Sequence, residues 1–402
     1  MKSNLMRLIL AVAWLAAGWP AAPARAQVAP ADDMLLYMPL LSQDSGAYAA
    51  GLYVPLVTYA GWPGEVNAAI ALTGKTHGLY LVSAGFNCKW VDNVTKLRQQ
   101  LDVVHAKGAM SLITWMPTDC SNGGFGDVTK LSLQDILNGA WDTYLAQWAT
   151  DLAALGYPVM VRWGHEMNIP SYSWAGQNAF GANGETKWNA VPAGDCGGQV
   201  LTGCYGDPTV VDGPERFIAA YRYVHDRVAP TATNVIWVWN PNGRDWLDGA
   251  DEASQPAWNH FTSYYPGDAY VDWVGPDGYN WGAESGNGGT PYTWDTFDAL
   301  FNGPLTEMAA LYPAKPQVIP EFASVEDKYD PNRKAAWLVD AYSAARKYPL
   351  LRAMIYVHDP SFMDAFYYPS AAPATFQIDS STAASAAYKQ AVAGWSSRPP
   401  QP

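Results

Sequence analysis

Short apolar runs alternate with amphipathic stretches along most of the chain. From Gly51 onward, runs rich in β-branched and aromatic residues are followed by stretches whose apolar residues recur at helical spacing. This order is typical of βα units, in which helices cover a parallel sheet. The predicted strands are Gly51–Val57, Gly78–Val82, Ala109–Trp115, Pro158–Trp163, Asn234–Trp239, Val271–Gly275, Pro316–Pro320 and Arg352–Val357.

Helical patterns follow most of these strands. The connection around Gly243–Ser263 has the weakest helical pattern, and a Gly/Asn/Trp-rich insertion, Ile169–Asp212, separates the fourth strand from its helix. Barrels place substrate contacts in insertions of this kind. The clearest predicted helices are Val91–Lys107, Leu131–Leu155, Pro214–Val228, Trp294–Leu311, Asn332–Lys347 and Thr382–Trp395.

The number and order of these units favour one α/β fold. Eight βα units follow one another without an intervening linker. An open doubly wound sheet would carry a Gly-rich phosphate turn after its first strand, and the segment Thr58–Gly64 is not such a turn. We therefore predict a single (β/α)8 barrel with a long insertion after strand four.

The first 26 residues have the order of a secretory signal peptide. A basic start is followed by the apolar stretch Leu8–Trp19 and by small residues that include Ala24 and Ala26. The apolar stretch is shorter than the roughly 20 residues that a spanning helix needs. We expect residues 1–26 to be removed, and residues 27–398 to form the barrel of a soluble protein that is secreted or periplasmic, without further membrane contact.

Composition excludes several classes of function. The chain has 402 residues, a net charge of −13, 19 Trp and 24 Tyr, which is too rich in core-forming residues for a disordered chain. Nucleic acids and anionic membranes bind clusters of Lys and Arg, and no such cluster is present. We expect a monomer without nucleic-acid partners, cofactor or metal.

The four cysteines are expected to form two disulfides if the protein is exported. Cys196 and Cys204 share a Gly-rich loop, whereas Cys88 and Cys120 each follow a strand-like run. Pairing of Cys88 with Cys120 and of Cys196 with Cys204 is favoured. The alternative for Cys88 and Cys120 is a pair of buried free thiols, and the spacing is unlike that of a zinc site.

Two glutamates stand directly after apolar runs, Glu166 after the fourth predicted strand and Glu321 after the seventh. Barrel active sites lie at the carboxyl ends of the strands, so these carboxylates are expected to face one another across the mouth of the barrel. Paired carboxylates suit glycoside hydrolysis, at a separation of about 5–5.5 Å for retention and roughly 6.5–9.5 Å for inversion. A glutamate at a strand end can also be a structural ion-pair partner.

Four stretches of the chain resemble glycoside hydrolase family 26, namely Arg162–Asn168, Trp237–Asn242, Tyr265–Asn280 and Lys315–Phe322. The most specific element is the His-Glu-Met-Asn run after Arg162. The resemblance spans strands one to eight. It implies a retaining barrel hydrolase of a family dominated by endo-β-1,4-mannanases, with some β-1,3-xylanases and mixed-linkage glucanases.

The resemblance also implies roles for individual residues. Glu166 would be the acid/base and Glu321 the nucleophile, with His165 and Tyr279 orienting the nucleophile. Arg162 is expected to brace the floor of the site, and Trp174 and Trp281 to stack on sugar rings. The expected substrate-binding residues are Arg162, Asn168, Ser171, Tyr172, Trp174, Asp277, Trp281 and Tyr356.

These features together predict a secreted, endo-acting glycoside hydrolase that cleaves a β-linked polysaccharide of the mannan type, or a related one, by a retaining double displacement. Two alternatives remain open. The protein could process an exopolysaccharide of the producing cell as a hydrolase or transglycosylase, or it could be a polysaccharide-binding barrel without catalysis.

The chain departs from the family pattern at Ser171, where an aromatic residue is usual, and at Tyr356, where Trp is usual. A missing stacking partner is worth about 0.5–1.5 kcal/mol. We therefore expect a decorated or differently linked β-glycan to be preferred over unbranched β-1,4-mannan. The measurement is the ratio of kcat/KM on linear and branched substrates for wild type and Ser171→Trp. Preference of the wild type for linear mannan, with no change of the ratio in the variant, would remove Ser171 as a specificity position.

Overall fold

The structure is a computed structural model whose described residues belong to one compact unit, Asp44–Pro402. Several sequence predictions fall on residues outside this description: the signal peptide, all four cysteines, Ser171 and much of the insertion after the fourth strand. The described residues are 48–53, 62–86, 94–118, 131–170, 172–176, 203, 205–245, 256–282, 293–327, 329–359 and 376–400.

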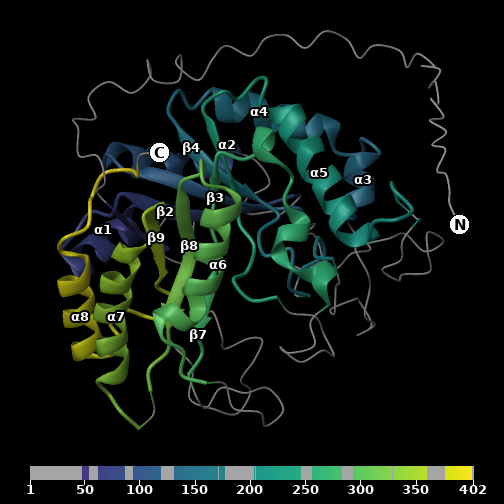
Figure 1. Ribbon diagram of the computed structural model, residues 1–402. Coiled ribbons are helices and arrows are strands. Elements are labelled where there is room, and N and C mark those ends of the chain that lie inside the picture. Colours follow the sequence, from purple (N-terminus) through teal and green to yellow (C-terminus); the bar gives the residue numbers. More distant parts are fainter. Residues whose placement is uncertain are drawn as a thin grey trace, which may run out of the picture. The chain divides into compact units, whose positions relative to one another are not determined.

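Parallel strands close into a barrel, which confirms the predicted (β/α)8 fold. Neighbouring strands pair in chain order from β1 to β6, β1 also pairs with β9, and β9 with β8. The pairing of Val274 with Gln317 joins β6 to β8 and closes the ring (Figure 1). The strands are β1 Ala49–Tyr53, β2 Leu79–Gly85, β3 Met110–Met116, β4 Val159–Trp163, β5 Val235–Trp239, β6 Trp273–Val274, β7 Gly278–Asn280, β8 Gln317–Ser324 and β9 Leu351–Val357.

The sixth barrel position is divided between β6 and β7. The sequence predicted one strand over Val271–Gly275, but the structure has a break at Gly275–Asp277 before β7 resumes beside β8. Pro276 has no N–H to donate to a neighbouring strand, which accounts for the interruption. Asp277 lies in this break, where it bridges to Asn242, and the next residue, Gly278, pairs with Phe322 of β8.

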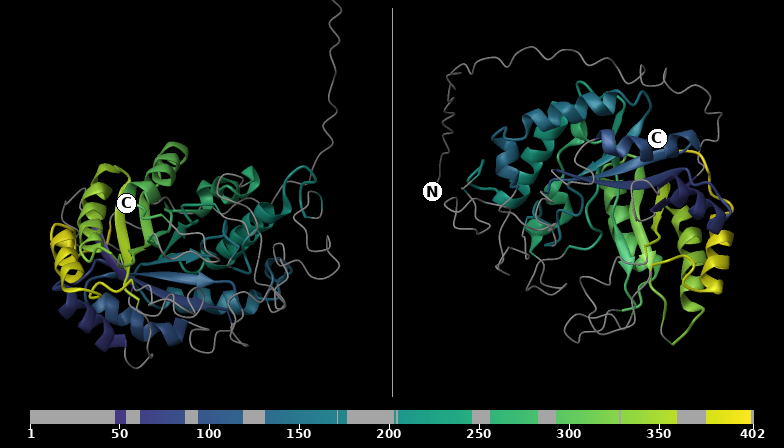
Figure 2. Two further views of the ribbon diagram at one scale, coloured as in Figure 1. Left: turned by 90° about the horizontal axis from the view of Figure 1, so that it is seen from below. Right: turned by 180° about the vertical axis from the view of Figure 1, so that it is seen from behind.

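The helices lie outside the strands, with α7 and α8 side by side (Figures 1 and 2). One predicted helix needs correction: Leu131–Leu155 is two helices, because Gly139, with φ of 80°, ends the first. The structure adds the helix Trp62–Thr73, which was not among the clearest predicted helices. The described part of Gly243–Ser263 holds only short 3-10 turns. The helices are α1 Trp62–Thr73, α2 Val94–Ala106, α3 Leu133–Leu137, α4 Asp142–Ala153, α5 Asp212–Val228, α6 Phe297–Leu311, α7 Arg333–Ala344 and α8 Thr382–Val392, with 3-10 turns η5 Ala257–Asn259, η6 Phe261–Tyr264, η7 Asp268–Tyr270 and η9 Ala345–Lys347.

Successive side chains along each strand point alternately to the helices and to the barrel interior, so the protein has two apolar cores. One apolar core lies between the sheet and the helices, and the other fills the barrel with inward side chains such as Leu81, Leu112, Met160 and Val318. None of the helices in the described part of the chain could cross a membrane. The inward-facing core is apolar near the start of the strands and becomes polar toward their carboxyl ends.

The closure of the barrel depends on a glycine beside β8. A Cβ at Gly275 would overlap the backbone carbonyl of Val318. We expect Gly275→Ala to lower the free energy of unfolding by about 3 kcal/mol, because the two strands must separate. Gly303→Ala in α6 is the matched control: its Cβ meets no atom within 4 Å, so stability should stay or rise by about 0.5–1 kcal/mol. Urea unfolding compares the two, and equal midpoints would contradict the closure argument.

Candidate active site

Side chains that alternate along and just after three strands bring polar groups into the barrel interior, near the carboxyl ends of the strands. On β4, Met160 faces inward and Arg162 follows it two residues later. On β3, Thr114 follows the inward Leu112, and after β5 the inward Val238 is followed by Asn240. Because side chains alternate with a period of two, these three residues share the interior.

Glu321 faces the interior because β8 contains a bulge. Ile319 and Phe322 both pack in the outer core although they are three residues apart, while their partners on β9, Met354 and Tyr356, are two apart. One extra residue in a strand reverses the alternation beyond it. Without this bulge Glu321 would face the helices. The strand also continues to Ser324, so Glu321 lies within the strand and not at its tip as predicted.

Arg162 is the centre of the polar network. Its side chain is fully buried, and its Nε donates to Thr114 Oγ1 at 2.7 Å. Nη1 donates to Asn240 Oδ1 at 2.6 Å and to Asp277 Oδ2 at 2.7 Å, and Nη2 donates to Glu321 Oε1. Charge-assisted hydrogen bonds of this kind are shorter and stronger than those between neutral groups. The network therefore holds the Glu321 carboxylate in a fixed position beside a positive charge, as suits a nucleophile.

Two further groups fix the position of Glu321. The Tyr279 hydroxyl donates to Glu321 Oε2, so Tyr279 contacts the carboxylate that it was expected to orient. The backbone N–H of Glu321 donates to Asp277 Oδ1 at 2.7 Å. Both carboxylate oxygens of Glu321 therefore accept a hydrogen bond, while its side chain stays 13% exposed.

Glu166 lies just beyond β4 in an uncommon backbone conformation. Its φ is 52°, the only positive value outside glycine among the described residues. Such a conformation costs about 1–3 kcal/mol and persists only where neighbours impose it. Here Glu166 N donates to Asn240 O at 2.8 Å. Asn242 Nδ2 donates to Oε1 at 2.8 Å and Tyr172 Oη to Oε2 at 3.1 Å.

The two glutamates differ in charge environment. Arg162 contacts Glu321 directly, whereas Glu166 has no ion-pair partner in the described structure. Burial and the charge of Glu321 raise the pKa of Glu166 to about 7, although Asn242, Arg162 and Tyr172 act in the opposite direction. Glu166 can therefore hold a proton near neutral pH, as a general acid must.

His165 does not occupy the position expected of it. Within the described residues it makes no hydrogen bond to Glu321, and its Nδ1 has no hydrogen-bond partner. The imidazole packs instead against the rings of Tyr172 and Trp174, at 4.8 and 5.6 Å between centroids. Burial and the nearby Arg162 hold its pKa well below the usual value, so the ring is neutral. The contact with Glu321 that was expected of His165 is made by Arg162.

Three predicted substrate-binding residues are inaccessible to a sugar. Arg162, Asn168 and Asp277 have no exposed area. The Asn168 amide donates to Asn242 O and to Asp245 Oδ1, each at 2.9 Å. These residues therefore hold the loops and the carboxylates in place, and the prediction of direct sugar contact is corrected.

The predicted aromatic contacts divide into accessible and buried rings. Trp174 and Tyr356 have no exposed area, so neither offers a face to a sugar, contrary to the prediction. Trp174 instead donates from Nε1 to His165 O at 2.7 Å and stacks on Tyr172 at 4.4 Å and 10°. Tyr172 and Trp281 are half-buried, and both touch groups of the site. Ser171 lies outside the described residues.

The asparagines that follow β5 were not among the predicted site residues. Asn240 binds Arg162, and Asn242 binds Glu166. A signal was present, because both come directly after a strand, where barrel site residues occur. Thr114 was also missed, since a threonine inside a strand is most often a packing residue.

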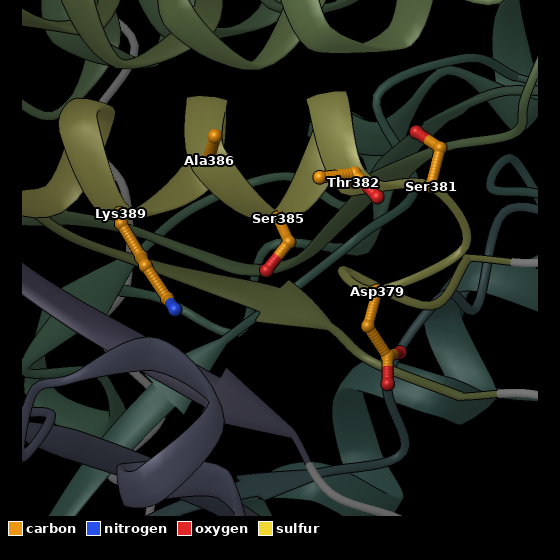
Figure 3. Close-up of a pocket in the computed structure, with 6 residues that line it drawn as sticks. All are labelled: Asp379, Ser381, Thr382, Ser385, Ala386 and Lys389. Carbon is orange, nitrogen blue, oxygen red and sulfur yellow. The ribbon is translucent and has the colours of Figure 1, made fainter.

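A surface hollow elsewhere on the molecule is not part of this site. Figure 3 shows it at the start of α8, where the side chains of that helix form one wall. None of the groups that contact Glu166 or Glu321 lines it. Its lining residues are Asp379, Ser381, Thr382, Ser385, Ala386 and Lys389.

Comparisons with known proteins connect this geometry to a family. The sequence profile of glycosyl hydrolase family 26 matches residues 129–331, which include both glutamates. Endoglucanase H of Acetivibrio thermocellus is 29% identical over 361 residues, which are 89% of this chain and 32% of that protein. The chain thus spans about a third of the length of this curated relative.

Solved structures share the fold at low sequence identity. The catalytic domain of the family 26 endo-β-1,4-mannanase from Bacillus sp. JAMB-750 matches with a TM-score of 0.57 and 16% identity over 86% of each chain. A double mutant of the endo-β-1,4-mannanase of Cellulomonas fimi matches with 0.56 and 15%, over 86% of this chain and 70% of that one.

The contact between Tyr172 and Glu166 leads to a prediction about pH dependence. The hydroxyl stabilises the ionised form of Glu166, so Tyr172→Phe should raise the pKa of Glu166 further. Activity that needs protonated Glu166 falls as pH rises through this pKa. The alkaline limb of kcat/KM should therefore move up by about one pH unit, as expected for loss of roughly 1.5 kcal/mol.

The matched control is Tyr157→Phe, which removes a hydroxyl–carboxylate hydrogen bond of 2.6 Å to Asp102 on α2. Its pH profile should equal that of the wild type. An alkaline limb of Tyr172→Phe that stays in place or moves to lower pH would contradict the assigned contact.

Proposed function

The chain belongs to glycosyl hydrolase family 26, and on that premise we propose that it is a retaining, endo-acting glycosidase that cleaves a β-linked polysaccharide of the mannan type or a related one. The observation that carries the proposal is the unequal pair of carboxyls in one buried site. Glu321 is paired with Arg162 and Tyr279, while the pKa of Glu166 is raised to about 7. One group is suited to attack and the other to proton transfer.

In the first step of this reaction, Glu321 attacks the anomeric carbon as the bond to the leaving oxygen breaks, and Glu166 gives its proton to that oxygen. In the second step, Glu166, now ionised, takes a proton from a water molecule that attacks the glycosyl–Glu321 ester. The sugar leaves with its original anomeric configuration, and Glu321 regains its negative charge.

The surrounding residues support both steps. Arg162 and Tyr279 each donate a hydrogen bond to one oxygen of Glu321, so they hold its carboxylate in one orientation between turnovers. Asn242 and Tyr172 donate to the two oxygens of Glu166. These donors favour the ionised form of Glu166, which is the form that acts as base in the second step.

The choice of polysaccharide follows from the relatives. The curated relative is named an endoglucanase and the solved relatives are named endo-β-1,4-mannanases, so the proposal includes both glucan and mannan backbones. We also propose, from the signal-like order of residues 1–26, that the protein acts after export, in the periplasm or outside the cell.

The proposal is tested by incubating purified protein with mannan, glucomannan, β-1,3-xylan and mixed-linkage glucan. Oligosaccharide release with retention, followed by NMR of the anomeric protons in the first minutes, is the expected result. Release with inverted configuration would overturn the double displacement. Only monosaccharide release from chain ends would overturn endo action.

The two glutamates should respond differently to substitution. Glu321→Ala should remove turnover on every substrate, because no nucleophile remains. Glu166→Ala should lower kcat/KM on polysaccharide by roughly 10²–10⁴-fold, but should still be glycosylated by aryl glycosides with good leaving groups, which need no protonation. Azide should then restore deglycosylation.

Glu65→Ala, in the first turn of α1, is the carboxylate control and should retain wild-type activity. If Glu321→Ala keeps activity within about tenfold of wild type, or if azide rescues Glu321→Ala and not Glu166→Ala, the assignment of the pair is wrong.

A further inference from the structure

Aromatic side chains continue outward from the group that binds Glu321. Tyr279 donates to Glu321, and its ring lies 5.3 Å from that of Trp281. Gly282 follows in a left-handed turn, with φ of 73°, and a Cβ there would lie 3.8 Å from Trp294. Trp281 and Trp294 are half-buried, and Trp281 follows the strand that carries Tyr279, so both lie on a loop that leaves the carboxyl end of β7.

The segment between β8 and α7 contacts Trp294 through Arg333, the first residue of α7. The guanidinium carbon of Arg333 lies 4.4 Å from the centre of the Trp294 ring, and its Nη1 donates to Asp327 Oδ2 at 2.6 Å. Asp327 Oδ1 also accepts from the backbone N–H of Tyr329 at 2.8 Å. Both loops are thus joined through Arg333, and Asp327 fixes the backbone that carries Tyr329.

Tyr329, whose backbone is bound by Asp327, is exposed to solvent. Its side chain is 76% exposed, and the other exposed large apolar side chains in the described part of the chain, Val210 and Leu311, are aliphatic. The backbone of Tyr329 is fixed by Asp327, and an aromatic side chain has few rotatable bonds to restrict when a ligand stacks on it. Sugar rings present apolar C–H faces, which suit such a ring.

The charges beside these rings favour a neutral ligand. Arg333 is paired with Asp327, and Arg244 with Asp295 at 3.0 Å. Each cation is therefore compensated by a carboxylate within the protein. An acidic glycan would have to compete for these cations, whereas a neutral one needs only ring faces and hydrogen bonds.

We propose that Trp281, Trp294 and Tyr329 form an outer subsite that binds a neutral polysaccharide chain extending from the catalytic pair. The inference rests on the proposed function, because it takes the occupant of the catalytic pair to be a glycan. It predicts that affinity rises with chain length, since a short oligosaccharide fills the site around Glu321 without reaching Tyr329.

The test measures equilibrium binding apart from turnover. In the full-length Glu321→Gln protein, calorimetry compares glucomannan and mixed-linkage glucan with a disaccharide and a trisaccharide of each. Tyr329→Ala should weaken polysaccharide binding by about two- to tenfold, the loss expected for one stacked ring, and leave the short sugars unchanged. Trp294→Ala should act in the same direction.

Two controls separate stacking from a change in the fold. Tyr329→Phe retains the ring and should bind like the parent protein. Leu311→Ala removes another exposed apolar side chain, 51% exposed, at the end of α6, shortly before β8 begins, on the side of the barrel opposite the site. It should also leave binding unchanged.

The outcomes distinguish this inference from the proposed function. If Tyr329→Ala binds polysaccharides as tightly as Leu311→Ala, the subsite is refuted, whether or not the wild type hydrolyses them. If the wild type hydrolyses none of the polysaccharides but Tyr329→Ala weakens binding, the subsite stands and the proposed function fails. Absence of binding to both polysaccharides would overturn the subsite as well.

Discussion

The site is organised by one buried guanidinium. Moving a cation such as Arg162 out of water costs several kcal/mol, and only well-placed acceptors offset that cost. The acceptors come from β3, from the end of β5, from the break between β6 and β7, and from β8. Arg162 can therefore make all of its hydrogen bonds only when the barrel is closed. These hydrogen bonds in turn fix the position of Glu321.

Both carboxyls sit where regular backbone is interrupted. The bulge in β8 turns Glu321 from the helix-facing side to the interior, and Glu166 has a left-handed backbone just after β4. A regular barrel would place neither side chain correctly, because alternation and strand direction fix where each residue points. The irregularities are stable because the surrounding hydrogen bonds hold them, which is typical of functional sites.

Aromatic residues around the pair have two separate structural roles. Trp174 is buried and supports Tyr172, which reaches Glu166 with its hydroxyl. Trp281, Trp294 and Tyr329 are at least partly accessible, and Trp281 packs against Tyr279, which binds Glu321. A buried tryptophan such as Trp174 therefore supports the residues around Glu166, whereas a partly exposed one such as Trp281 keeps part of its surface accessible. The burial of each ring decides which of the two roles it can have.

The sequence by itself determined the barrel, through apolar runs of strand length separated by helical periodicity, and it identified both glutamates as polar residues that follow such runs. It also led to Tyr279, but it assigned the orientation of Glu321 to His165 and placed Arg162, Asn168, Asp277, Trp174 and Tyr356 among the substrate contacts. Only the tertiary structure decided those roles, and only it revealed Asn240 and Asn242. The physical reason is that burial and hydrogen-bond partners depend on residues more than a hundred positions apart, such as Arg162 and Glu321. Local patterns determine which face of a strand a residue is on, but not which distant side chain meets it there.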